Sequence, residues 1–386
     1  MTGITIILIY VLIFLAIYPF AIYPIILYIL SKVNNRKIKN DEKFTPEITF
    51  LISAYNEELY IEKCINSIYN SEYPKDKITI FVGSDGSNDK TNSILDKLNK
   101  EHSTLNYEIF KRIGKNQVLN QLIKKANTEL IYFLDGDMEI PSGTITKIVS
   151  YLADEKVGAA YCNIKMTHSS KDTGGLGEKL YQKFENFIRT KESQILTTVN
   201  SFGALLIRKS LISSGFPSDR ILDDNYAVLN VSNQNFRVTY DNKVIINELR
   251  PKTLKDEFKR RIRIISAGLA TFLYFKKALA FKKGYFSFFL YSHKIIRIFS
   301  PIYLILILCL SIIIEKSEVG KWLLMLQFLF YSSAFAGYAL ELLKAKIKIF
   351  KIPLFYLVMN FSFLLGIFRF LSSKQNSIWN NEGLEK

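Results

Sequence analysis

The sequence lacks the patterns that define several common protein classes. Its three cysteines, Cys64, Cys162 and Cys309, are unrelated in spacing, which excludes a disulfide framework and a cysteine-based metal site. There is no G-x-G-x-x-G motif. Gly114 and Lys115 lack the upstream glycine and the following hydroxyl of a P-loop. A dehydrogenase and an ATPase are therefore disfavoured.

The formal net charge of +16 comes without a basic recognition helix or an RNA-binding signature, so we expect no nucleic-acid partner. The basic residues lie mostly beside long apolar stretches. Anionic lipid headgroups and the preference of cytoplasmic loops for lysine and arginine account for that placement. The charge therefore indicates contact with membrane lipids.

Residues 4–30 form an uncharged apolar run that exceeds the ~20 residues needed to cross a bilayer. The run is longer than a signal-peptide core and has neither a basic start nor a small-residue cleavage site. Basic residues follow at once: Lys32, Arg36, Lys37 and Lys39. We predict an N-terminal membrane anchor, kinked at Pro19 and Pro24, that leaves the next domain on the cytoplasmic side of the plasma membrane.

Three more apolar runs follow near the C-terminus, over 298–314, 322–343 and 352–368. We expect the first two to cross the membrane. The third has only about 17 residues and either crosses or re-enters, which leaves the side of the C-terminus open. Lysines follow the second run, as cytoplasmic loops prefer: Lys344, Lys346, Lys348 and Lys351. His293 is expected to face lipid headgroups rather than to bind a metal.

Between these ends, strand-like and helix-like patterns alternate. Apolar runs over 48–53, 78–82, 107–110 and 131–134 are each followed by polar residues and then by an amphipathic segment. This alternation predicts an α/β fold with a mostly parallel, doubly wound sheet and helices on both faces. The polar residues then gather at one edge of the sheet, where such folds bind nucleotides.

The fourth apolar run leads directly into Asp135 and Asp137, separated by Gly136. Two neighbouring carboxylates raise each other's pKa unless a cation lies between them. Oxygen ligands at a strand end suit Mg²⁺ or Mn²⁺, which bind through one or two carboxylates and substrate phosphates. The pattern favours a metal–diphosphate site, with a solvated turn as the alternative.

Four motifs stand in order: residues 52–58 (ISAYNEE), 84–89 (SDGSND), 114–120 (GKNQVLN) and 135–137 (DGD). They resemble the ordered motifs of glycosyltransferase family 2, which has a GT-A-type nucleotide-sugar-binding domain. Later segments resemble its membrane-integrated polysaccharide-synthase branch, which includes poly-N-acetylglucosamine, chitin-oligosaccharide, hyaluronan and cellulose synthases. Those segments are 181–186 (YQKFEN), 192–193 (ES), 202–205 (FGAL) and 207–209 (IRK).

The resemblance implies a donor site and a metal site. The donor residues would be Ala54, Tyr55 and Glu57 around the base, Asp85 on the base edge or ribose, Lys115 near the diphosphate, and Arg263. Asp137 would be the direct ligand of Mg²⁺ or Mn²⁺, with Asp135 on the ribose or the metal.

Asp224 is the expected catalytic residue. Residues 222–224 (LDD) stand in the place of the family's Thr/Glu-Asp motif, whose last carboxylate acts as general base. Removing a proton from the attacking sugar hydroxyl is worth typically 10²–10⁴-fold in rate. Asp223 would be its hydrogen-bonded neighbour on the acceptor side, together with Gly203. The alternative is that both acids only stabilise the first turn of a helix.

The sequence departs from the polysaccharide synthases at residues 260–264 (RRIRI), where that branch carries Q-x-x-R-W. Arg263 keeps the arginine, which suits a bidentate contact with the leaving diphosphate. On the acceptor side, Arg260 replaces the glutamine, and Ile264 replaces the tryptophan that would stack on a sugar. Long processive synthesis is thereby disfavoured, but transfer is not. A plainer alternative is that 256–283 forms an interfacial helix that binds lipid headgroups.

We therefore predict five parts: an anchor over 1–33, a cytoplasmic GT-A domain over 46–255, amphipathic interfacial helices over 256–291, membrane helices over 292–372 and a tail over 373–386. The predicted activity is metal-dependent, inverting transfer from a UDP-sugar to a lipid-linked or growing polysaccharide acceptor. Two alternatives stay open: a single transfer to a lipid carrier or glycolipid, and a catalytically inactive sugar-nucleotide sensor.

Overall fold

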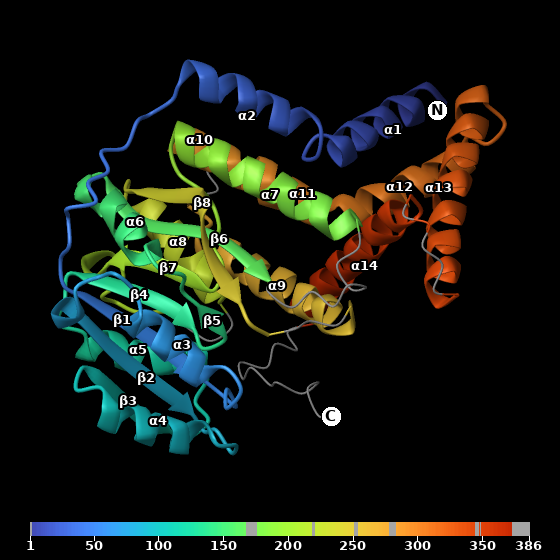
Figure 1. Ribbon diagram of the computed structural model, residues 1–386. Coiled ribbons are helices and arrows are strands. Elements are labelled where there is room, and N and C mark those ends of the chain that lie inside the picture. Colours follow the sequence, from blue (N-terminus) through green and yellow to red (C-terminus); the bar gives the residue numbers. More distant parts are fainter. Residues whose placement is uncertain are drawn as a thin grey trace.

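The computed structural model describes residues 2–166, 176–217, 221–250, 254–277, 283–343, 347 and 349–372. Its centre is an eight-stranded mixed sheet of order β3-β2-β1-β4-β7-β6-β8-β5, with helices on both faces (Figure 1). The strands are β1 Ile48–Ala54, β2 Ile78–Asp85, β3 Leu105–Phe110, β4 Leu130–Asp135, β5 Met138–Glu139, β6 Val157–Met166, β7 Ala204–Arg208 and β8 Arg237–Glu248. The predicted α/β architecture is confirmed.

Parallel pairing brings the polar strand ends to one edge. β1 pairs in parallel with β2 and β4, and β2 pairs in parallel with β3. β6 and β8 are also parallel, whereas β7 and β5 run antiparallel to their neighbours. Ser53 of β1 lies opposite both Gly83 of β2 and Asp135 of β4. Asp85 and Asp135 therefore flank the carboxyl end of β1, as the sequence predicts.

Two apolar cores form, one on each face of the sheet. One contains α3 Ile61–Tyr69, α4 Thr91–Glu101 and α6 Thr144–Ser150. The other contains α5 Lys115–Lys125, α7 Leu176–Ile195, α8 Asp223–Asn233 and α9 Leu254–Tyr274. Along β1, Phe50 and Ile52 belong to the first core and Leu51 to the second, because successive strand side chains point to opposite faces.

The remaining helices include the membrane candidates. They are α1 Thr2–Ile17, α2 Ile22–Val33, α10 Tyr285–Phe289, a π-helical turn Leu290–Ile295, α11 Ile296–Ile298, α12 Ser300–Ile313, α13 Glu318–Leu342 and α14 Lys351–Leu371. α13 and α14 are each long and apolar enough to cross a membrane. Two bent pairs, α1 with α2 (56°) and α10–α11 with α12 (54°), raise the number of candidate spans in the described residues to as many as four.

These helices refine the predicted spans. The break between α1 and α2 contains Pro19, whereas Pro24 lies in the first turn of α2, where proline is tolerated. The marginal third run belongs to α14, which has 21 residues and is long enough to cross. Lys344, Lys346 and Lys348 lie outside the described residues, so the orientation stays a prediction.

The expectation for His293 is wrong. Its side chain is buried, with 2% exposed. Nδ1 lies 2.8 Å from Glu192 Oε1, and Nε2 lies 3.3 Å from Glu185 Oε2. The two glutamates lie about two helical turns apart on α7, and they give the imidazole polar partners in the protein interior. The sequence near His293 could not predict these partners, because both glutamates lie about 100 residues away in the chain.

A glycine allows α14 to approach α9 closely. A Cβ at Gly366 would lie 2.7 Å from Cβ and Cγ2 of Ile265 and 3.2 Å from the carbonyl oxygen of Ile262. Phe258 and Phe361 also stack between the two helices, with ring centroids 6.0 Å apart. The helix next to the candidate site is thus packed directly on a candidate membrane span.

We expect Gly366→Ala to lower the stability of the protein by about 1–3 kcal/mol, because the added methyl group overlaps Ile265. Thermal unfolding in detergent would measure the change. The matched control is Gly3→Ala in α1, where an added Cβ has no atom within 4 Å. A melting temperature for Gly366→Ala equal to that of the control would contradict the tight contact.

Candidate active site

Lys115 joins three elements at the carboxyl edge of the sheet. It begins α5 directly after Gly114, whose φ of 95° favours glycine. Its Nζ lies 2.6 Å from Asp135 Oδ1 at the end of β4 and 2.6 Å from Asp223 Oδ2 at the start of α8. Burial opposes the positive charge, but the two carboxylates raise the pKa of Lys115 well above its usual value. The ammonium group therefore stays charged.

Asp223 and Asp224 are adjacent in sequence, but their surroundings move their pKa values in opposite directions. Burial alone would raise the pKa of Asp223, yet Lys115 holds it below the usual value. Partial burial, followed by the charge of Asp223, raises the pKa of Asp224 to about 7. The backbone N–H of Gly203 donates to Asp224 Oδ2 at 3.1 Å. A carboxyl group with a pKa near neutrality suits a general base.

Gly203 lies between two of the predicted site residues. Its carbonyl oxygen accepts a hydrogen bond from the Asp135 N–H at 2.8 Å, while its own N–H reaches Asp224. Its φ is 43°, and a Cβ would lie 2.9 Å from Asp135 Oδ2. Both the backbone conformation and the close approach of Asp135 therefore require glycine here.

Arg263, on α9, reaches the same cluster. Its side chain is exposed to solvent, and it interacts electrostatically with Asp223, Asp135 and Asp224. The predicted leaving-group arginine and the predicted base are thus brought together. Arg260 lies one turn away and pairs with Glu257, with Nε 2.8 Å from Oε2. Ile264 is partly buried on the same helix.

A second cluster is centred on Arg250, which the sequence analysis did not identify. Its Nε donates to Asp137 Oδ2 at 3.0 Å, and its Nη2 donates to both carboxylate oxygens of Glu57. Arg250 follows β8, and the pairing of Glu248 with Met138 places it beside Asp137. The two residues are 113 positions apart, so only the sheet pairing could have revealed the contact.

The acidic residues of this region fit a divalent cation. Burial raises the pKa of Glu57 to about 8; Arg250 opposes the rise, and Asp137 and Asp135 add to it. Asp135 and Asp137 offer the hard oxygen donors that Mg²⁺ and Mn²⁺ prefer. In the described ranges, no three His, Cys, Asp or Glu side chains form a metal site by themselves. Diphosphate oxygens of the donor would have to complete the coordination.

Two of the predicted base-binding residues, Tyr55 and Asp85, lie around Arg112, whereas Glu57 pairs with Arg250 instead. Asp85 is buried and accepts hydrogen bonds from the backbone N–H groups of Ile113, at 2.7 Å, and Gly114, at 3.0 Å, and from the Arg112 guanidinium. That guanidinium lies 3.4 Å from the centre of the Tyr55 ring. Asp85 therefore orients the loop after β3. Its contact with a base or ribose stays a prediction.

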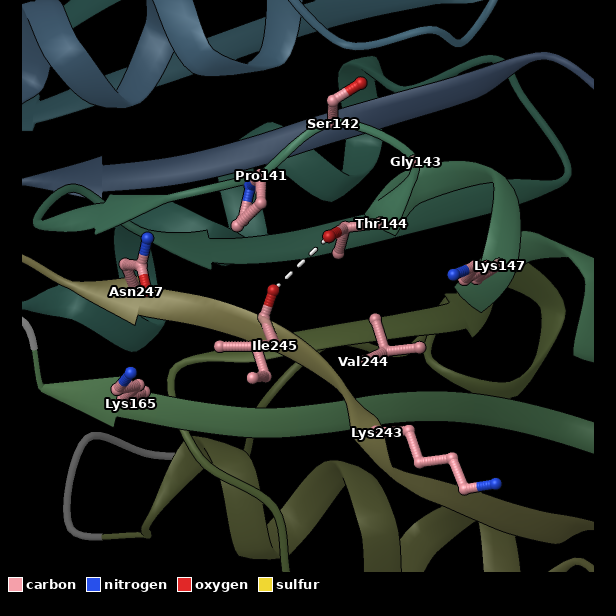
Figure 2. Close-up of a pocket in the computed structure, with 10 residues that line it drawn as sticks. All are labelled: Pro141, Ser142, Gly143, Thr144, Lys147, Lys165, Lys243, Val244, Ile245 and Asn247. Carbon is pink, nitrogen blue, oxygen red and sulfur yellow. Dashed lines mark hydrogen bonds between the residues drawn. The ribbon is translucent and has the colours of Figure 1, made fainter.

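A cavity of about 340 Å³ lies elsewhere, beside α6, β6 and β8 (Figure 2). Its lining includes Lys147, Lys165 and Lys243. The Thr144 hydroxyl donates to the Ile245 carbonyl oxygen at 3.3 Å across it. None of the predicted site residues lines this cavity, so it is separate from the candidate active site.

A family model described as glycosyl transferase family 2 matches residues 49–216. Residues 49–216 form a glycosyltransferase family 2 domain. This glycosyltransferase domain contains the strand-edge residues Glu57, Asp85, Lys115, Asp135 and Asp137. The first residues of α8, together with Arg250 and Arg263, lie beyond the matched segment and complete the clusters through the tertiary fold.

Two curated bacterial relatives extend the comparison. The poly-β-1,6-N-acetyl-D-glucosamine synthase of Staphylococcus epidermidis is 25% identical over 262 residues, which cover 66% of this chain and 63% of the relative. The probable glycosyltransferase YdaM of Bacillus subtilis is 25% identical over 280 residues, which cover 68% of this chain and 66% of the relative. Each is therefore matched over less than two thirds of its own length.

The fold is also that of a solved glycosyltransferase. Mannosyltransferase PcManGT from Pyrobaculum calidifontis, in complex with GDP-Man and Mn²⁺, superposes with a TM-score of 0.74. It is 23% identical, and the match covers 95% of this chain and 100% of the other. At this identity the likeness shows the fold alone. This similarity in fold covers nearly the whole chain, whereas the family model covers only residues 49–216.

We expect the rate of sugar transfer to rise with pH and to level off above about 7. Asp224, with its pKa raised to about 7, is mostly protonated at lower pH and then cannot accept the proton of a hydroxyl. The rate should therefore fall roughly tenfold per pH unit below that value. Initial rates across the pH range, at saturating donor, would measure the profile.

Asp224→Asn should lower kcat by roughly 10²–10⁴-fold and remove this pH dependence. Asp76→Asn, at an exposed aspartate just before the amino end of β2 and so at the opposite end of the strand from the cluster, is the control and should keep the wild-type profile. A wild-type profile in Asp224→Asn would show that another group is the base.

Proposed function

We propose that the chain is a membrane-integrated, inverting glycosyltransferase that transfers a sugar from a nucleotide-sugar, with UDP as the expected nucleotide, to a lipid-linked or growing polysaccharide acceptor. The observation that carries the proposal is the environment of the Asp224 carboxyl group. Its pKa is raised to about 7, and it lies beside the Lys115 bridge in a glycosyltransferase family 2 fold. This is the environment that a base for a sugar hydroxyl requires.

A single displacement accounts for the residues around Asp224. The acceptor hydroxyl loses its proton to Asp224 as its oxygen attacks C1 of the donor sugar, and the bond from C1 to the diphosphate breaks. Arg263 and Lys115, which interact with Asp135 and Asp223 beside the base, would offset the departing negative charge. Fixed charges of this kind stabilise a transition state without reorganisation during the reaction. Attack opposite the leaving group inverts C1, in keeping with the β linkage named for the synthase relatives.

Asp137 and Asp135 would hold a Mg²⁺ or Mn²⁺ ion. When bound, such an ion offsets the negative charge of a leaving diphosphate. Support comes from the crowding of Glu57, Asp135 and Asp137, and from PcManGT, whose structure holds GDP-Man and Mn²⁺. Tyr55, Ala54 and Asp85 lie further along the same edge, and we assign the base and ribose to them.

The membrane helices point to the class of acceptor. α9 carries Arg263 and packs on α14 through Gly366, so the proposed transfer takes place next to a candidate span. An acceptor that is attached to a lipid, or that leaves through the membrane, fits this placement. We propose the cytoplasmic membrane as the location, with the catalytic domain on its cytoplasmic side.

A single-transfer enzyme is the second candidate, and Ile264 favours it. An aliphatic residue at this position lacks the flat face that would stack on an acceptor sugar. Purified protein incubated with a lipid acceptor and a panel of labelled UDP-sugars and GDP-mannose would identify the donor by nucleotide release. The length of the labelled product then separates polymer synthesis from one transfer. Absence of release with every donor would overturn the proposed function.

The effect of removing one metal ligand can be measured as a loss of Mn²⁺ binding, without measuring turnover. We expect Asp137→Asn to weaken Mn²⁺ binding by at least the roughly 10- to 100-fold that loss of a residue supporting a metal ligand costs, and to abolish stimulation of donor binding by Mn²⁺. Electron paramagnetic resonance titration with Mn²⁺ and UDP would measure this directly. The matched control is Glu139→Gln, two residues further on, whose carboxylate pairs with Lys63 at 2.9 Å. Equal Mn²⁺ affinity in both variants would contradict the proposed metal site.

A further inference from the structure

A cluster of buried charges lies outside the candidate active site, where α7 meets the segment from the π-helical turn to α11. Glu185, on α7, is 4% exposed. It contacts Arg189 Nη2 at 3.0 Å, His293 Nε2 at 3.3 Å and the guanidinium of Arg297. Burial alone would raise the pKa of Glu185, but the surrounding cations hold it well below its usual value. Glu185 is therefore a carboxylate shared among cations.

Arg189 extends from this cluster toward the catalytic edge. One side of its guanidinium is held by Glu185, and the group lies 4.3 Å from the centre of the Phe202 ring and 5.9 Å from that of Tyr240. Arg189 is 6% exposed. A cation over an aromatic face is held more strongly when water is excluded. The position of the Phe202 ring is therefore tied to Arg189.

Phe202 directly precedes Gly203, whose backbone N–H donates a hydrogen bond to Asp224. The amide between Phe202 and Gly203 donates its N–H to Asp224 Oδ2 at 3.1 Å. The next carbonyl, that of Gly203, accepts the N–H of Asp135 at 2.8 Å. A displacement of the Phe202 ring would thus rotate or move the amide that orients the carboxyl group of Asp224.

We propose that Arg189 is a positioning residue for sugar transfer: held by Glu185, which Arg297 pairs with from the other side, it fixes Phe202 and thereby the amide that orients Asp224. The inference rests on the proposed role of Asp224 as base. Within the described residues, Arg189 has no hydrogen bond or ion pair with the predicted donor residues, so its effect should fall on the chemical step. The same glutamate links the catalytic edge to the candidate membrane helices.

The network continues into the N-terminal helix pair. His293 Nδ1 lies 2.8 Å from Glu192 Oε1, and the same oxygen accepts the Tyr23 hydroxyl of α2 at 2.7 Å. Helices from both ends of the chain therefore converge on α7 beside Glu185. Because α7 carries Glu185, Arg189 and Glu192 on neighbouring turns, one rigid helix transmits their positions to Phe202.

The test compares Arg189→Met with Lys183→Met, which removes an exposed cation on the same helix. We expect Arg189→Met to lower kcat by roughly 10- to 100-fold, the cost of a misplaced catalytic group, with the donor KM and the UDP dissociation constant unchanged. The Gly203 N–H favours ionised Asp224, so the pH midpoint of kcat should also move upward. Lys183→Met should match the wild type in all four measurements.

Arg189→Lys should recover part of kcat, because an ammonium group keeps the charge beside Glu185 and Phe202. Phe202→Leu leaves no buried charge unpaired and should reproduce the loss of kcat and the shifted midpoint; it carries the test if Arg189→Met does not fold. Normal kcat in Phe202→Leu, or a loss with an unmoved pH midpoint, would overturn the positioning role. Transfer by the wild type and Lys183→Met tests the proposed function separately.

Discussion

Crowding of negative charge at one edge of the sheet is the constraint on which the rest of the site depends. The carboxylates concerned are Glu57, Asp135, Asp137, Asp223 and Asp224. Partly buried carboxylates at such spacing repel one another unless cations separate them. Lys115 bridges two of them, and Arg250 bridges two others. Removing one partner of a buried ion pair typically costs about 3–5 kcal/mol, because the remaining charge is left uncompensated.

The same cations distribute protons among the acids. Lys115 contacts Asp223 directly and keeps it ionised. Asp224, one residue on, accepts a hydrogen bond from the backbone N–H of Gly203, and the charge of Asp223 raises its pKa. Adjacent carboxyl groups whose environments push their pKa values apart can take different roles in a reaction. The helix-end interpretation of the two acids is therefore insufficient, since Asp223 is committed to Lys115 rather than to the helix terminus alone.

The carboxyl edge of the sheet and the candidate membrane helices form one packed structure. α9 carries Arg263 and lies against α14 through Gly366, and α7 connects Phe202 to Arg297 through two buried charges. Buried charges of this kind contribute little net stability when paired, but they are costly to break. They therefore hold one arrangement of helices against the sheet and make the geometry around Gly203 sensitive to how those helices pack.

Local patterns were enough to predict the first four strands, the sheet class and most of the acids, because strand periodicity and the residues that follow each strand depend on a few neighbouring positions. They also sufficed for the glycosyltransferase family 2 motifs. They could not reveal Arg250, the buried position of His293 or the stacking of Arg189 on Phe202. Those contacts join segments far apart in the chain, and only the pairing of β5 with β8 and the packing of α7 bring them within reach. Which residues could ionise was thus set by sequence, whereas which of them hold a proton near neutral pH was decided by the charges that the tertiary fold places beside them.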